Sequence, residues 1–217
     1  MNFEQARFNM VEQQIRPWEV LDQDVLDLLY TVPREDFVPP AHRALAFSDL
    51  EIPLGEGEAM WAPKIEARVL QALRVKKTDR VLEVGTGSGY FCALLAHRAA
   101  QVRSVEIRPR LAAFGRANLE RAGLDNVALE AGDAAQGWAK HAPYDVVVLT
   151  GSTPVLPPSW LAQLTVGGRL FAVVGDAPVM QARMVTCAAP REYVTAELFE
   201  TLLAPLANAA RPARFEF

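Results

Sequence analysis

The segment VLEVGTGSGYF, residues 81–91, constrains the fold more than any other part of this sequence. A short apolar strand pattern runs directly into Gly85, Gly87 and Gly89, and an apolar helix pattern follows. Glycines allow the backbone to turn sharply and allow a ligand to approach it closely. Such a strand, glycine loop and helix are typical of open parallel sheets, which bind ligands beyond the carboxyl ends of their strands.

Strand and helix patterns alternate from residue 80 onward. The expected strands cover residues 80–84, 101–107, 126–133, 144–150, 168–175, 181–189 and 192–200, and the expected helices cover residues 89–99, 108–123 and 157–168. The last two strands alternate in a way that suits antiparallel pairing. The sequence therefore predicts the α/β class, with a doubly wound, mostly parallel, seven-stranded sheet covered on both faces.

The first third of the chain has a different character. Residues 3–15 carry a helical apolar stripe, and a second helix is expected from the N-cap Asp22 to just before Pro33. The run GEGEAMWAPKIEA, residues 55–67, begins like a flexible, solvent-facing loop but contains a tryptophan. We expect an N-terminal helical subdomain with this loop (residues 1–75), a ligand-binding core (76–205) and a C-terminal tail (206–217).

Composition excludes several classes of function. A length of 217 residues fits one domain with an appended subdomain, and 51% hydrophobic residues suffice for a large core. The net charge of -4 and the lack of a strong basic cluster argue against a nucleic-acid partner. Two cysteines and three scattered histidines provide neither a disulfide framework nor metal-ligand spacing. No signal peptide or bilayer-spanning run is visible, so we expect a cytoplasmic protein with no membrane partner.

Acidic residues end the next two expected strands. Glu106 ends the second, and Gly132 and Asp133 end the third. A carboxylate at such a position can accept both hydroxyls of a ribose, although Glu106 could instead cap the following helix and Asp133 could be a turn residue. A dehydrogenase fingerprint requires glycine or alanine where Tyr90 stands, and no phosphate-binding lysine follows, so NAD and P-loop chemistry are disfavoured.

The order E-x-G-x-G-x-G, then an acid, then Gly-Asp resembles class I S-adenosylmethionine-dependent methyltransferases, which have a Rossmann-like fold. The resemblance implies that S-adenosylmethionine is the cofactor and S-adenosylhomocysteine the product. It places residues 83–89 by the methionine part, Glu106 by the ribose and Asp133 by the adenine. The implied cofactor-binding residues are Glu83, Gly85, Thr86, Gly87, Ser88, Gly89, Glu106, Ile107, Gly132, Asp133 and Ala134.

The resemblance extends to a narrower family. The blocks VPREDFVP, AFSDLEIPLG and VGTGSGY occur in this order, and together with YDVVVLTGSTPVLPPSWLAQLTVGGRLFAVVG they resemble protein-L-isoaspartate O-methyltransferase over most of the chain. The family has a seven-stranded core and an N-terminal helical extension. It implies methyl transfer to the free carboxylate of isoaspartyl residues in damaged proteins or peptides.

One motif departs from the family pattern. Family members carry Thr-Ile-Ser-x-Pro where this chain has Ala-Met-Trp-Ala-Pro, so Ala59 replaces the threonine and Trp61 the serine, while Pro63 matches. A carboxylate acceptor is already ionised and needs positioning rather than a strong base. The catalytic residue is therefore left unassigned, and the candidates for substrate binding are Trp61, Pro63, Thr150 and Ser152.

Three interpretations of Trp61 remain open. It could wall or cover the cofactor pocket beside a shifted acceptor, fill the former acceptor pocket, or pack the N-terminal region onto the core. Lys64 and Arg68 are expected to be solvated on the following helix. The alternatives to isoaspartyl methylation are the same cofactor with another acceptor, and a catalytically weak cofactor-binding homologue.

Overall fold

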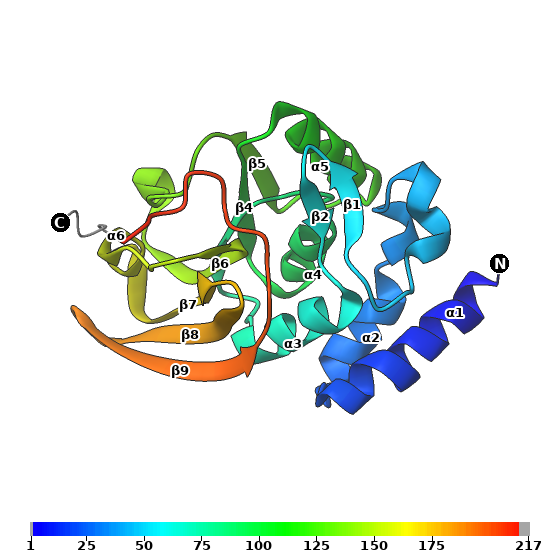
Figure 1. The fold of residues 1–217 in the computed structure, drawn as a ribbon, viewed down its shortest axis with the longest axis horizontal. Coiled ribbons are helices and arrows are strands. Elements are labelled where there is room, and N and C mark those ends of the chain that lie inside the picture. Colours follow the sequence, from blue (N-terminus) through cyan, green and yellow to red (C-terminus); the bar gives the residue numbers. More distant parts are fainter. Residues whose placement is uncertain (1, 213–217) are drawn as a thin grey trace.

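The computed structural model describes residues 2–212, which form a seven-stranded sheet with an N-terminal helical region (Figure 1). The strands of the sheet are β3 (Arg80–Val84), β4 (Gln101–Glu106), β5 (Val127–Ala131), β6 (Tyr144–Thr153), β7 (Leu164–Asp176), β8 (Val179–Ala189) and β9 (Glu192–Glu200). The α-helices are α1 (Phe3–Asn9), α2 (Gln23–Thr31), α3 (Pro63–Leu73), α4 (Tyr90–Arg98), α5 (Pro109–Arg121) and α6 (Pro158–Leu161).

The sheet has the predicted class and composition. Its order is β5-β4-β3-β6-β7-β8-β9, in which the first five strands are parallel and β8 and β9 join by antiparallel pairing. The predicted mostly parallel, seven-stranded α/β sheet is therefore confirmed. Because parallel strands point the same way, β3, β4, β5 and β6 all end at one edge, where ligands bind in such folds.

Alternating side chains of the strands build two apolar cores. Val81 packs on one face of the sheet with residues of α2, α3 and α4, whereas Leu82 packs on the other with Trp160 of α6. Neighbouring residues of a strand point to opposite faces, so continuous apolar strands are required when both faces are covered. In the described part of the chain, no helix combines the length and apolar character that membrane crossing requires.

The N-terminal helices lie together at one end of the molecule (Figure 1). Asn2 caps α1 by accepting the Gln5 N–H, and a π-helical turn, Met10–Ile15, continues it. Asp22 caps α2 as predicted, accepting the N–H groups of Asp24 and Val25. Short 3₁₀ turns follow at Arg34–Asp36 and Pro40–Leu45, in the proline-rich region.

Two local expectations were wrong. Residues 55–67 are not a flexible loop, because β1 (Ile52–Gly55) and β2 (Glu58–Met60) form an antiparallel hairpin that ends where α3 begins. The glycines and glutamates occupy the hairpin turn, where Gly55 and Gly57 supply positive φ. The helix expected at residues 157–168 stops at Leu161, and Leu164 already begins β7, which is longer than the pattern indicated.

Candidate functional site

A cavity of about 170 Å³ lies at the carboxyl ends of the parallel strands. Gly85 after β3, Glu106 at the end of β4, Gly132 after β5 and Thr150 in β6 all line it. A second cavity of about 50 Å³ adjoins the same glycine loop and shares Trp61 and Gly87 with the first. The edge that the strand pattern identified is therefore a hollow site that four strands build together.

The glycine loop lies tightly against β6. Gly85 has a φ of 97°, and a Cβ at this position would lie 2.2 Å from Thr150 Oγ1. The Thr150 hydroxyl lies 2.7 Å from the carbonyl oxygen of Val84 and 2.9 Å from that of Gly85, and it donates to them. The loop thus presents bare backbone to the cavity, and the Thr150 hydroxyl is occupied by the main chain.

Glu106 both organises the loop and faces the cavity. Its Oε2 accepts the Gly87 N–H at 2.9 Å, and its Oε1 accepts the Arg108 N–H at 3.0 Å. The helix-capping role considered from the sequence is not present, because α5 begins after Arg108 without a side-chain capping hydrogen bond. A carboxylate has about four lone-pair sites, so two remain able to accept ribose hydroxyls.

Glu83 is fully buried behind the glycine loop. The Ser104 hydroxyl donates to its Oε2 at 2.5 Å, while its Oε1 has no hydrogen-bond partner among the described residues. Burial raises the pKa of Glu83 to about 8, although the hydrogen bond from Ser104 opposes this shift. Glu83 also lines the second cavity.

Asp133 is held in place at the far end of the cavity. Its Oδ1 accepts the Ala135 N–H at 2.9 Å, which is the turn role considered from the sequence. Its Oδ2 accepts the Asn208 side-chain amide at 2.8 Å. The neighbouring Gly132 packs against Trp138, and a Cβ on Gly132 would lie 2.6 Å from that indole.

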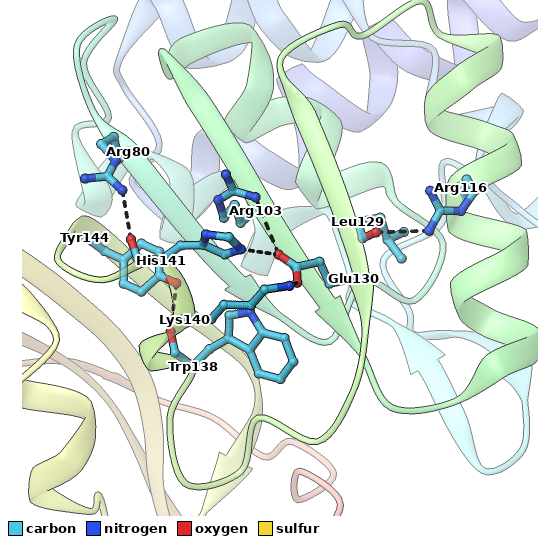
Figure 2. A network of polar contacts seen from close by, with 9 residues as sticks. All are labelled: Arg80, Arg103, Arg116, Leu129, Glu130, Trp138, Lys140, His141 and Tyr144. Atoms are coloured by element: carbon cyan, nitrogen blue, oxygen red, sulfur yellow. Dashed lines mark hydrogen bonds and ion pairs between the residues drawn. The ribbon is translucent and has the colours of Figure 1, made fainter.

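A polar network supports this end of the site from outside (Figure 2). Glu130 of β5 accepts from Lys140 at 2.6 Å and contacts His141 at 2.7 Å, and Arg103 lies 3.5 Å away. Hydrogen bonding from Lys140 lowers the pKa of the Glu130 carboxyl. The Tyr144 hydroxyl donates to the Trp138 carbonyl at 2.8 Å, which fixes the segment that packs on Gly132.

A segment near the C-terminus closes one side of the cavity. Residues 203–207 line it, and they are attached to β6 through Ser152. The Ser152 hydroxyl donates to the Leu203 carbonyl at 2.9 Å, and main-chain bonds join Ser152 to Ala204 and Leu206. The tail expected from residue 206 therefore starts later, because Leu206 and Ala207 belong to the cavity wall; residues 213–217 of it lie outside the described residues.

Trp61 is a packed wall of both cavities. Its side chain is 7% exposed, and its ring centroid lies 5.3 Å from that of Phe91 and 6.1 Å from that of Phe171. Its Nε1–H donates to the Thr150 carbonyl at 2.8 Å. Trp61 thus lines both cavities and also packs the N-terminal region onto the sheet, while the place of the acceptor relative to it stays a prediction.

A buried arginine fixes the main chain at Trp61. Arg34 donates to the Trp61 carbonyl at 2.6 Å and to the Ala46 carbonyl at 2.8 Å, and it forms an ion pair with the buried Glu66. Its guanidinium lies 5.0 Å from the centre of the Tyr90 ring. All of these partners come from different segments, so Arg34 sets the position of the hairpin end relative to α3 and α4.

The structure brings most of the sequence-predicted site residues together. The predicted residues that line one or both cavities are Ala59, Trp61, Glu83, Gly85, Thr86, Gly87, Ser88, Glu106, Ile107, Gly132, Asp133, Ala134 and Thr150. Gly89, Pro63 and Ser152 do not line either cavity: Gly89 starts α4, Pro63 starts α3, and Ser152 bonds to residues 203–206.

The expectation that Lys64 and Arg68 are solvated was wrong. Lys64 pairs with Asp49 at 2.8 Å and lies 4.0 Å from the centre of the Trp18 ring. Arg68 stacks 4.2 Å from the Phe199 ring centre. Long cationic side chains cover apolar surface readily, and here they join the N-terminal region to α3 and β9.

Sequence reasoning missed Glu51, Leu54 and residues 203–207 among the lining residues. Leu54 lies in β1 and Glu51 directly before it, so both precede residues 55–67, the segment that was expected to be a loop. The apolar run Ala-Pro-Leu at residues 204–206 was the available signal for the C-terminal wall, but nothing local indicated where it returns to the fold.

Comparisons with known proteins agree with this geometry. The family model Protein-L-isoaspartate(D-aspartate) O-methyltransferase matches residues 5–210. The chain is similar to a protein-L-isoaspartate O-methyltransferase of Gloeobacter violaceus, with 39% identity covering 91% of this chain and 96% of that protein. It is also similar to a protein-L-isoaspartate O-methyltransferase of Methanoculleus marisnigri, with 44% identity covering 78% of this chain and 77% of that protein.

Solved structures give the same result. A structure of a protein-L-isoaspartate O-methyltransferase has a TM-score of 0.78 and 25% identity, covering 93% of this chain and 66% of that chain. A Plasmodium falciparum structure in complex with S-adenosyl-L-homocysteine shares the fold, with a TM-score of 0.78 and 19% identity over 95% of this chain and 99% of that chain.

Proposed function

Because this chain belongs to the protein-L-isoaspartate O-methyltransferase family, we propose that it transfers a methyl group from S-adenosylmethionine to the free carboxylate of isoaspartyl residues in damaged proteins. The observation that carries the proposal is the continuous family match over residues 5–210, which includes both the N-terminal region and the core. Relatives of this name cover most of the chain at about 40% identity.

The cavity residues fit this cofactor. Glu106 keeps lone pairs for the ribose hydroxyls, the unpartnered Oε1 of Glu83 suits a positive charge, and Asp133 stands at the end proposed for the adenine. Gly85 and Gly87 offer backbone without side chains. S-adenosylmethionine, when bound, supplies a methyl group carried by a positively charged sulfur.

The remaining task of the protein is to position the acceptor and exclude water. The acceptor carboxylate is ionised at neutral pH, so it can attack the methyl carbon directly and no strong base is needed. Trp61 and residues 203–207 wall the cavity with apolar groups, which removes water from the reacting atoms. The hydroxyls of Thr150 and Ser152 donate to main-chain carbonyls, so neither is available to hold the acceptor.

A second candidate is the same cofactor with another acceptor, or a homologue with little transferase activity. The packing of Trp61 at the position of the family's serine favours it, because the indole occupies space that a serine leaves open. Loss of one positioned donor lowers rates by about 10- to 1,000-fold at other preorganised sites.

The deciding experiment measures methyl transfer from labelled S-adenosylmethionine to an isoaspartyl peptide and to its aspartyl twin, with cofactor affinity measured on the same sample. Transfer confined to the isoaspartyl peptide supports the proposal. Tight cofactor binding without transfer supports the second candidate. In that case the double variant Ala59→Thr and Trp61→Ser should restore transfer if the scaffold still fits this acceptor. The cytoplasmic location and the lack of a nucleic-acid partner stay predictions.

A further inference from the structure

Glu51 and Trp61 flank the β1–β2 hairpin where its two strands meet the rest of the chain. The outermost pair of the hairpin joins Ile52 to Met60, and Glu51 precedes this pair while Trp61 follows it. Both side chains, like that of Ala59 two positions along, line the larger cavity.

The Glu51 carboxylate is the unpaired acid of this hairpin face. Glu58 forms an ion pair with Arg108 at 2.7 Å, and the nearby Asp49 pairs with Lys64 at 2.8 Å. Among the contacts between described residues, no ion pair or hydrogen bond involves Glu51. Glu51 is an exposed residue, and partial burial of its carboxyl raises the pKa of that group.

The indole of Trp61 complements this carboxylate. Its Nε1–H donates to the Thr150 carbonyl, and its ring packs against Phe91 and Phe171. The part of Trp61 that lines the cavity is therefore the aromatic ring and not the polar N–H group. A carboxylate beside an aromatic ring is a favourable environment for an ammonium or guanidinium group. No lysine, arginine or histidine of the described chain lines either cavity, so no internal cation competes for this position.

We propose that Glu51 and Trp61 form a subsite for a positively charged side chain, lysine or arginine, adjacent to the isoaspartyl residue of the acceptor peptide. The subsite rests on the proposed function, because it assumes that a peptide acceptor enters this cavity. It makes Trp61 a specificity-determining residue: the position that lost a hydroxyl donor gained a surface for a cation.

The test uses isoaspartyl peptides that are identical except for lysine, glutamine or glutamate at one position beside the isoaspartyl residue, with a set for each side. We expect kcat/KM for the lysine peptide to exceed that for the glutamine peptide by about 3- to 30-fold on at least one side. The glutamate peptide should be the poorest substrate, and added salt should weaken the lysine preference.

Glu51→Gln is the diagnostic variant, because it keeps the side-chain shape and removes the charge. It should reduce the lysine preference to less than about twofold. Glu56→Gln is the matched control, since Glu56 is an exposed glutamate at the turn of the same hairpin and does not line the cavity. Equal kcat/KM for all three peptides, or a preference that Glu51→Gln leaves unchanged, would overturn the subsite.

Equilibrium affinity separates this inference from the proposed function. The same peptides are titrated into protein loaded with S-adenosylhomocysteine and followed by calorimetry. A lysine preference in affinity without methyl transfer to any peptide would refute isoaspartyl methylation and support the subsite. Equal affinities for the three peptides, or no binding of any of them, would refute the subsite.

Discussion

Replacing Trp61 with serine should destabilise the fold strongly, because most of the indole is buried against Phe91 and Phe171. Truncation of a buried aromatic residue costs about 3–5 kcal/mol. The lost hydrogen bond to the Thr150 carbonyl adds about 1 kcal/mol. A total loss of about 4–6 kcal/mol is a large share of the ~5–15 kcal/mol that stabilises a typical domain. For a chain of this size it corresponds to a decrease in Tm of about 10–20 °C.

Urea unfolding followed by circular dichroism measures this loss as a shift in the midpoint at constant slope. Trp61→Phe should lose only about 1–3 kcal/mol, because a six-membered aromatic ring remains while the five-membered ring and its N–H donor are removed. Trp18→Ser is the control for tryptophan loss as such: Trp18 is 42% exposed, and we expect about 1 kcal/mol or less.

The size of the loss in unfolding free energy shows whether Trp61 is a fixed wall of the cavity or a moving lid. A lid spends part of its time away from Phe91 and Phe171, so its removal would leave the free energy of unfolding nearly unchanged. A loss below about 1 kcal/mol in Trp61→Ser would therefore refute the packed wall. It would also remove the fixed aromatic surface that the proposed cation subsite requires.

Three further perturbations probe the cofactor end. Glu106→Ala should weaken S-adenosylhomocysteine binding at least about tenfold in calorimetry, and unchanged affinity would remove Glu106 from the site. Asn208→Ala removes the hydrogen bond to Asp133 and should raise the Kd for S-adenosylhomocysteine about 2- to 10-fold. An unchanged Kd would mean that this contact does not support the pocket. Because Lys140 lowers the pKa of Glu130, the stabilisation is complete above the ordinary value of 4.5 and disappears as the pH falls through the lowered folded value. Glu130→Gln should thus lose about 1 kcal/mol at pH 7, and in urea unfolding this difference from the unsubstituted protein should disappear as the pH falls through the lowered folded value; a loss independent of pH would contradict the ion-pair assignment.

The class of the sheet and the centre of the site could be predicted because their signals are local. The glycines after residue 84 and the acids at Glu106 and Asp133 follow strands whose apolar patterns are unambiguous, and parallel strands must end at the same edge. The resemblance to the family then predicted that Ala59 and Trp61 replace its hydroxyl residues, which stays a prediction, and the residues alone left the role of Trp61 open.

The hairpin and the C-terminal wall could not be predicted for physical reasons. β1 and β2 have four and three residues, too few for a periodic pattern, and the polar turn between them has the composition of a loop. The return of residues 203–207 to Ser152 depends on pairing between distant parts of the chain. The packing of Lys64 and Arg68 was missed because composition does not distinguish a solvated cation from one lying over an aromatic ring.

The attachment of residues 203–208 to β6 and Asp133 also affects the order in which the protein matures. A growing chain that ends before Leu203 already contains all strands of the sheet, yet it lacks one wall of the cavity. During synthesis, domains fold from the N-terminal side as the chain emerges. The binding site should therefore be completed only when residues 203–208 have left the ribosome.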